Sequence, residues 1–173
     1  MTLNLPEGVV NLAFKTIVVA TDFSDASNLA LEYARVLANR FDAGLRVLHV
    51  VQTPMPLGSE MYVPEVMTVA ERAVQEVQQQ LTTTLERIGG DNVIGQVLMG
   101  LAPRKIVEYA TDHEADLIVM GTHGRGAIAH LLMGSVAERV VRTAPCPVFT
   151  VRDTEALRWA STESADAAAG TVS

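Results

Sequence analysis

Five short apolar runs alternate with longer amphipathic segments along most of the chain, and few architectures accommodate this order. The runs lie at residues 17–20, 45–51, 93–99, 117–120 and 148–151. Apolar runs of this length are typical of strands that are buried on both faces of a parallel sheet. Strands that alternate with helices imply right-handed crossovers, which place helices on both faces of the sheet. The sequence therefore predicts an α/β fold built on a five-stranded parallel sheet.

Capping and breaking residues mark four helices between these runs. The first begins at Ser24 or Asp25 and stops at Gly44, and the second spans about 64–88. The third has Pro103 in its first turn, and the fourth begins at Gly134-Ser135 and ends before Pro145. The residues expected to face inward are Ala26, Ala30, Tyr33, Leu37 and Phe41 in the first helix, Ile106, Val107 and Ala110 in the third, and Val136, Val140 and Val141 in the fourth.

A chain of 173 residues is expected to form a single domain, which we place at residues 14–152. Residues 1–13 are expected to be a flexible N-terminal extension. Residues 153–173 are expected to be a disordered tail, because they are rich in Ala, Ser and Thr and have little to bury. Residues 52–63 contain breakers and apolar side chains, which fit either a lid over a pocket or an ordinary packed loop.

Composition argues against several functional classes. The net charge is −7 and the basic residues are scattered, with only Arg104 and Lys105 adjacent, so a nucleic-acid surface is not expected. No apolar run is long enough to cross a bilayer, and residues 1–13 lack the features of a signal peptide, so we expect a cytoplasmic protein without membrane contact. The single cysteine, Cys146, excludes an internal disulfide and is expected to be an inert packing residue.

A glycine-rich segment after the fourth apolar run marks the candidate ligand site. Its spacing is Gly121-x2-Gly124-x9-Gly134-Ser135, and neither GxxxxGK[ST] nor a GxGxxG after the first strand occurs. Glycine allows the backbone to approach a ligand without a Cβ in the way. The first N–H groups of the following helix have no intrahelical partner and lie at the positive end of its dipole. The segment therefore predicts a phosphate site made of main-chain N–H groups.

The G-x2-G-x9-G-[ST] spacing, set between these two strands, resembles the ATP-binding branch of the universal stress protein family over roughly residues 15–152. The resemblance implies a Rossmann-like sheet of order 3-2-1-4-5, with strands 17–20 and 117–120 side by side where the order reverses. Ligands bind such sheets beyond the carboxyl ends of the strands at that point. The implied ligand is ATP, with or without Mg²⁺ or Mn²⁺, and ADP, AMP and cyclic AMP remain alternatives.

The expected contacts divide among the parts of the nucleotide. Asp22 suits the ribose, or a divalent ion shared with the phosphates, while helix capping is its alternative role. The resemblance implies that the backbone of Val50 or Val51 meets adenine. The N–H groups of Gly124, Arg125, Gly134 and Ser135 are expected to bind phosphate. Met120 and Val136 are expected to give apolar contact to the ligand, or only core packing. The full expected set is Ala20, Thr21, Asp22, Val50, Met120, Gly121, Gly124, Arg125, Gly134, Ser135 and Val136. Ala137 stands where ATP-binding members often have a second hydroxyl.

Three functions fit these features: an ATP-binding regulatory protein of the stress response, a nucleotide-hydrolysing enzyme, and a nucleotide-independent dimeric scaffold. Binding with slow or no hydrolysis is favoured, because the loop has no lysine and no evident base beyond Asp22 and His123. The four histidines are scattered and form no metal-ligand cluster. An apolar last strand at the sheet edge is normally covered, so we expect a homodimer through Val148, Phe149, Thr150 and Val151.

Overall fold

The computed structural model describes residues 13–52, 64–122 and 133–152, and in this part of the chain strands and helices alternate strictly. All five strands pair in parallel, in the order β3-β2-β1-β4-β5. The predicted fold class and strand order are therefore confirmed. The strands are β1 (Thr16–Ala20), β2 (Gly44–Val51), β3 (Val93–Met99), β4 (Leu117–Gly121) and β5 (Val148–Val151), and the helices are α1 (Asp25–Phe41), α2 (Pro64–Ile88), α3 (Ala102–Asp112) and α4 (Ser135–Thr143).

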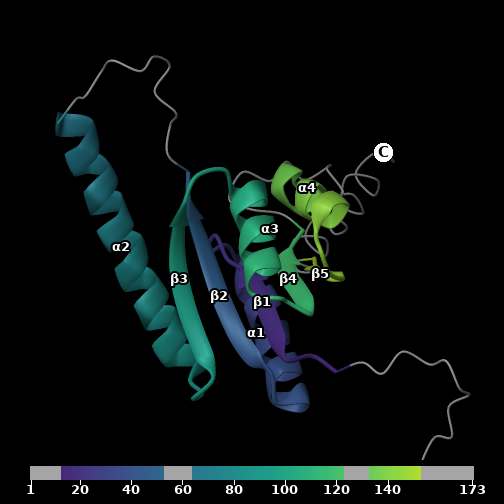
Figure 1. Cartoon of the computed structure of the whole chain (residues 1–173). Helices are drawn as coiled ribbons and strands as arrows, with labels where there is room; N and C mark the ends of the chain where they lie inside the picture. The colour runs from purple at the N-terminus through teal and green to yellow at the C-terminus, as the bar shows by residue number, and fades with distance from the viewer. Residues whose placement is uncertain (1–12, 53–63, 123–132, 153–173) are drawn as a thin grey trace, which may run out of the picture.

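Helices cover both faces of the sheet, with α1 and α2 on one side and α3 and α4 on the other (Figure 1). Successive side chains of β1 serve the two sides in turn. Ile17 and Val19 join the core beneath α1 and α2, while Val18 joins the core beneath α3 and α4. This period of two gives the molecule two apolar cores separated by the sheet.

The inward stripe of α1 is made mostly of small residues, among them Ala30 and Ala34, which are fully buried together with Leu31. The predicted inward position of Tyr33 is wrong, because its side chain is 48% exposed. Tyr33 instead lies beside Phe149 of β5, with ring centroids 5.8 Å apart. Small side chains let the helix lie close to the sheet, and the tyrosine occupies the flank near the sheet edge.

The fourth helix shows a similar difference from its prediction. Val140 is fully buried and Ala137 is almost so, whereas Val141, also expected inward, is 46% exposed. The helix contacts α3 and β5, and the buried side chains on it are those of Ala137 and Val140.

Capping residues set the ends of α1. Ser24 is the N-cap, and its hydroxyl oxygen accepts a hydrogen bond from the N–H of Ser27 at 3.3 Å. Ser24 was one of the two residues predicted to cap this helix. The predicted stop at Gly44 is wrong, because the helix ends earlier and Asp42 closes it with a left-handed φ of 54°. Gly44 is the first residue of β2, where its N–H donates to the carbonyl of Lys15 at 2.8 Å.

Glycine in β3 allows close packing at the edge of the sheet. A Cβ at Gly95 would lie 2.5 Å from Cδ1 of Leu85 and 3.1 Å from Leu81, both on α2. The absence of a side chain at Gly95 therefore lets α2 approach this edge strand.

The segment predicted at 52–63 to be a lid or a packed loop lies, except for Gln52, outside the described residues. The tail predicted at 153–173 and nearly all of the extension predicted at 1–13 also lie outside them. None of the helices in the described part of the chain combines the length and hydropathy that crossing a bilayer requires.

Candidate functional site

The carboxyl ends of β1 and β4 lie side by side, as the strand order requires. Ala20 at the end of β1 is paired with Met120 in β4. The segments that follow Ala20 and Gly121 therefore leave the same edge of the sheet. The chain passes from β1 to β2 on one side and from β4 to β5 on the other, so the strand order reverses here. This is the position at which open α/β sheets bind ligands.

Two backbone hydrogen bonds close the base of the loop that follows β4. The N–H of Thr122 donates to the carbonyl of Val151 at 2.8 Å, and the N–H of Gly134 donates to the carbonyl of Thr122 at 2.7 Å. These bonds place the start of α4 directly at the end of β4. The N–H of Gly134, which the sequence assigned to phosphate, is engaged by the protein itself. Gly124 and Arg125 lie between these anchors and outside the described residues.

The N-cap residue of α4 provides no capping side chain. Gly134 is the N-cap, with φ −72° and ψ 154°, and supplies no side-chain acceptor. The first intrahelical bond runs from the N–H of Glu138 to the carbonyl of Gly134 at 2.9 Å. The N–H groups of Ser135, Val136 and Ala137 therefore have no intrahelical acceptor, and the positive end of the helix dipole lies with them. This is the geometry that an anion stabilises.

The turn after β1 holds Asp22 by hydrogen bonds. Its Oδ1 accepts the N–H of Ser24 at 3.1 Å and the hydroxyl of Ser24 at 2.6 Å. Thr21 is buried, and its Oγ1 accepts the N–H of Phe23 at 3.0 Å and lies 3.1 Å from Oγ of Ser27. Thr21 thus supports the turn from inside, and the half-buried Asp22 both stabilises the turn and stands at the crevice.

Gly121 is explained by packing. A Cβ at this position would lie 3.0 Å from the carbonyl carbon of Ala26 and 3.1 Å from the N atom of Ser27. Both are backbone atoms at the start of α1, so a larger residue here would require the start of that helix to shift by a few tenths of an ångström. The sequence grouped Gly121 with the ligand loop, but the structure gives it this contact between β4 and α1.

The backbone geometry of β2 distinguishes the two candidates for adenine. The carbonyl of Leu48 accepts the N–H of Thr21 at 2.8 Å, so the backbone groups of Leu48 face β1. Because these groups alternate in direction along a strand, those of Val50 face the same side, beyond the end of β1. The carbonyl of Val51 faces the other way and accepts the N–H of Gly100 at 3.0 Å. Val50 is therefore the residue whose backbone is directed toward the crevice.

Four apolar residues of the expected set lie in one cluster beneath α3 and α4. Met120 is 4% exposed and belongs to this core, while Ala20, Val50 and Val136 are half-buried and pack against it. Met120 therefore serves the core, and the other three form its border near the carboxyl ends of the strands.

The model of the universal stress protein family matches residues 13–152 of this chain. The chain belongs to the universal stress protein family. Universal stress proteins of Methanocaldococcus jannaschii and Thermus aquaticus are each 36% identical to it over 141 residues, which cover 80% of this chain and 82% and 99% of theirs.

Solved structures of other universal stress proteins share the fold. UspA from Lactobacillus plantarum has a TM-score of 0.74 at 27% identity, covering 82% of this chain and 100% of its own. A universal stress protein solved in complex with cAMP has a TM-score of 0.60 at 25% identity, covering 81% of this chain and 98% of its own.

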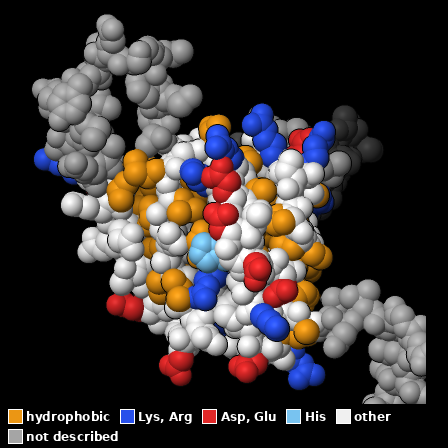
Figure 2. All heavy atoms as spheres, in the orientation of Figure 1, with side chains coloured by type: hydrophobic (Ala, Val, Ile, Leu, Met, Phe, Trp, Pro, Cys, Tyr) orange, Lys and Arg blue, Asp and Glu red, His pale blue; other side chains and the backbone are white. Residues whose placement is uncertain are grey.

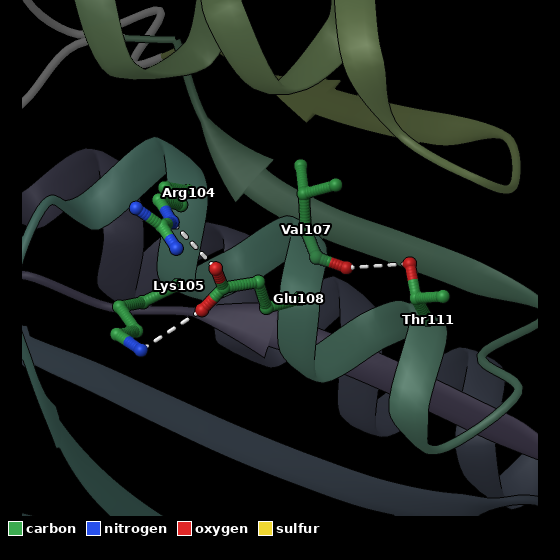
Figure 3. Close-up of polar contacts among 5 residues, drawn as sticks. All are labelled: Arg104, Lys105, Val107, Glu108 and Thr111. Atoms are coloured by element: carbon green, nitrogen blue, oxygen red, sulfur yellow. Dashed lines mark hydrogen bonds and ion pairs between the residues drawn. The ribbon is translucent and has the colours of Figure 1, made fainter.

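Basic side chains lie next to acidic ones on the face of this universal stress protein shown in Figure 2. On α3, the basic residues Arg104 and Lys105 come before the acidic residues Glu108 and Asp112. Arg104 and Lys105, the adjacent basic pair, both point toward Glu108, and Nζ of Lys105 lies 2.8 Å from its carboxylate (Figure 3). Hydrogen bonds from Lys105 and Arg104 lower the pKa of Glu108. The two cations thus share a carboxylate instead of forming an unpaired basic patch. The hydroxyl of Thr111 donates to the carbonyl of Val107 on the same helix.

The thiol of Cys146 is half-buried, and burial raises its pKa. A protonated thiol is a poor nucleophile, which agrees with the packing role expected from the sequence. In the described part of the chain, no group of three or more His, Cys, Asp and Glu side chains is arranged to hold a metal ion.

The sequence alone did not indicate a role for two residues near Asp22, which are His49 and Phe23. Nδ1 of His49 lies 2.9 Å from the carbonyl oxygen of Thr21, and its ring stacks on Phe23 with centroids 4.6 Å apart. A histidine within the apolar run 45–51 was the signal available in the sequence, because a polar ring in a buried strand needs a hydrogen-bond partner.

Proposed function

We propose that this universal stress protein binds an adenine nucleotide, ATP in the first place, in the crevice between the ends of β1 and β4. In this proposal it acts as a regulatory protein of the stress response, with slow or no hydrolysis. The uncapped start of α4 carries the proposal. Its first N–H groups have no intrahelical acceptor, the cap residue Gly134 has no side chain that could accept from them, and the helix begins where the strand order reverses.

Each part of the nucleotide has a group of matching chemistry. The N–H groups of Ser135 and Val136, with the exposed Ser135 hydroxyl, are assigned to phosphate, and Gly124 and Arg125 are proposed to add to them. Gly134 now contributes by shaping the loop, because its N–H is engaged by Thr122.

The ribose and the adenine are assigned to residues at the ends of β1 and β2, which are neighbouring strands. Asp22 is assigned to the ribose, since a carboxylate accepts hydroxyl hydrogens, or to a Mg²⁺ or Mn²⁺ ion that the phosphates bring. The backbone of Val50 is assigned to adenine, because it is directed beyond the end of β1. Both assignments agree with the existence of a similar protein in complex with cAMP, which contains adenine, ribose and one phosphate.

The binding assignment is tested at Ser135, the first residue of α4. Ser135→Asp adds a negative charge where the phosphates are proposed to bind, while an acidic residue in the first turn favours the helix itself. We expect ATP to bind about tenfold or more weakly, and adenosine, which lacks phosphate, to bind within about twofold of wild type. Isothermal titration calorimetry measures both.

Ser135→Ala is the matched control, because it removes the hydroxyl and leaves the N–H groups. We expect it to weaken ATP by no more than about fivefold, the loss of one ordinary hydrogen bond. Equal ATP affinity in wild type and Ser135→Asp would refute the phosphate assignment. No heat with millimolar ATP on the wild type would favour the nucleotide-independent scaffold.

Binding is favoured over catalysis because Asp22, the carboxylate assigned to the crevice, is already assigned to the ribose or to a metal ion. General-base catalysis requires a group that can take a proton from water. A multiple-turnover ATPase assay is expected to give rates below about 1 s⁻¹, and faster turnover would support the enzyme alternative.

We also propose that the protein is a homodimer that pairs through β5. The strand lies at the edge of the sheet, and Phe149 is 42% exposed. Tyr33 and Val36 of α1 are 48% and 58% exposed, and Tyr33 contacts Phe149, so these side chains extend the apolar surface beyond the strand. A second copy related by a two-fold axis would cover the edge and this surface together.

A further inference from the structure

The turn after β1 contains a strained residue next to Asp22. Phe23 has φ of 62°, in the left-handed region that large side chains rarely adopt. Glycine or asparagine would relieve the strain, so the surrounding structure must hold Phe23 in place. Its N–H donates to Oγ1 of Thr21 at 3.0 Å, which is one such restraint.

His49 of β2 supplies two further restraints. A carbonyl oxygen only accepts hydrogen bonds, so Nδ1 of His49 is the donor in its 2.9 Å contact with the carbonyl of Thr21. The imidazole also stacks on the ring of Phe23 at 4.6 Å, with 18° between the planes. One side chain therefore fixes both the residue before Asp22 and the residue after it.

Phe23 packs partly against the core beneath α1 and α2, and it also has free volume beside it. Phe23 borders an open cavity of about 410 Å³ between α1 and α2, which Asn28 and Arg87 also line. If the imidazole were removed, the phenyl ring would lose its stacking partner with free volume nearby. The turn would then relax toward a less strained backbone, and Asp22 would move with it.

We propose that His49 and Phe23 are positioning residues that hold the Asp22 carboxylate ready for the ribose hydroxyls. This inference rests on the function proposed above, since Asp22 meets a ribose only if the crevice binds a nucleotide. A carboxylate that is fixed before the ligand arrives loses less conformational freedom on binding. Loss of the restraint should therefore weaken ribose recognition more than the contacts to phosphate and adenine.

The readout is the ratio of the dissociation constants of 2′,3′-dideoxyATP and ATP, measured by calorimetry on the full chain. We expect about tenfold or more in wild type and a ratio near one in Asp22→Ala, because hydrogen bonds to a charged group are lost. His49→Ala is expected to bring the ratio to within about threefold of the Asp22→Ala value. His49→Phe, which keeps an aromatic ring without the donor, is expected to lie between wild type and His49→Ala.

His113 provides a matched control in the same chain. Its Nδ1 lies 2.9 Å from the carbonyl of Tyr109, and its ring stacks on Tyr109 at 3.8 Å. These are the same two kinds of contact, made at the end of α3 without Asp22 between the contacted groups. His113→Ala is expected to leave the ratio unchanged even if it lowers stability.

The outcomes separate this inference from the proposed function. If His49→Ala weakens both nucleotides equally and keeps the wild-type ratio, His49 only stabilises the fold and the inference is overturned. If wild type binds neither nucleotide, or if Asp22→Ala keeps the wild-type ratio, the proposed function or its ribose assignment fails and the inference falls with it. Should His49→Ala not fold, His49→Phe carries the same comparison.

Discussion

Gly121→Ala tests the contact that joins the end of β4 to the start of α1. The added Cβ would lie 3.0 Å from the carbonyl carbon of Ala26, 3.1 Å from its Cβ and 3.1 Å from the N atom of Ser27. Backbone atoms cannot rotate away as the end of a side chain can, so the start of α1 must shift by a few tenths of an ångström. Overpacking of this kind lowers the free energy of unfolding by about 1–3 kcal/mol.

Urea unfolding followed by far-UV circular dichroism measures this loss. With a denaturant slope of about 2 kcal/mol per molar urea, the midpoint should fall by about 0.5–1.5 M. Gly44→Ala is the control, because its nearest non-adjacent atom, the carbonyl oxygen of Lys15, would lie at an ordinary 3.6 Å. We expect Gly44→Ala to stay within about 0.5 kcal/mol of wild type.

Equal midpoints for Gly121→Ala, Gly44→Ala and wild type would refute the close-packing explanation. The same variant also distinguishes two roles for Gly121. If its stability is normal but its ATP affinity falls, the residue belongs to the ligand loop, as the glycine spacing suggested. If both fall together, the shifted start of α1 has carried the Asp22 turn with it.

Three further variants test other features. Asp42→Gly should raise the free energy of unfolding by about 0.5–1 kcal/mol in the same urea titration, because glycine adopts the left-handed C-cap conformation without strain; a lower midpoint would contradict this. Phe149→Asp should convert the proposed dimer to a monomer in light scattering at micromolar concentration, and a wild type that is already monomeric would refute the dimer. The pKa of Glu108 is lowered in the folded protein, so its carboxylate stabilises the fold at pH values above the usual glutamate pKa of about 4.3. This contribution is lost as the pH falls through the pKa that Glu108 has in the folded state. Glu108→Gln should therefore flatten the acid side of the stability–pH curve, and an unchanged curve would count against the ion pairs.

The strands were predictable because burial on both faces leaves a simple pattern in the sequence. The apolar runs match the observed strands within a residue at each end, and α2 has its predicted bounds of 64–88. The resemblance to a family, rather than the pattern itself, supplied the strand order. Periodicity therefore identified the elements, and the glycine spacing indicated how they are arranged.

The orientation of α1 was harder to predict. Tyr33 and Ala34 are neighbours in sequence, and hydrophobicity favours burying the larger side chain. The structure does the opposite, because the alanine face can lie closer to the sheet and the tyrosine reaches β5 at its edge. Which flank of a helix meets the sheet depends on the position of the other strands, and a single helical segment does not contain that information.

The glycines of the motif were identified by spacing, but their separate roles were not. Gly121 packs against α1, and Gly134 ties its N–H to Thr122 and leaves the start of α4 without a capping side chain. All glycines look alike in a sequence, and only the neighbouring atoms reveal which one avoids a collision and which one shapes a loop. His49 was missed for a related reason, since its hydrogen bond and its stacking partner both lie on another segment of the chain.

Main-chain groups make up most of the proposed site, and this affects how such a site is recognised. A backbone N–H at the start of α4 or at Val50 is present whatever side chain the residue carries, so relatives only 36% identical can keep the same arrangement. What the sequence must preserve is the packing that aims those groups: glycine at 121, no capping side chain at 134, and a support for the turn around Asp22. Substitutions at these supports should therefore alter binding through geometry, whereas a change of charge at Asp22, Arg125 or Ser135 should act on the ligand directly.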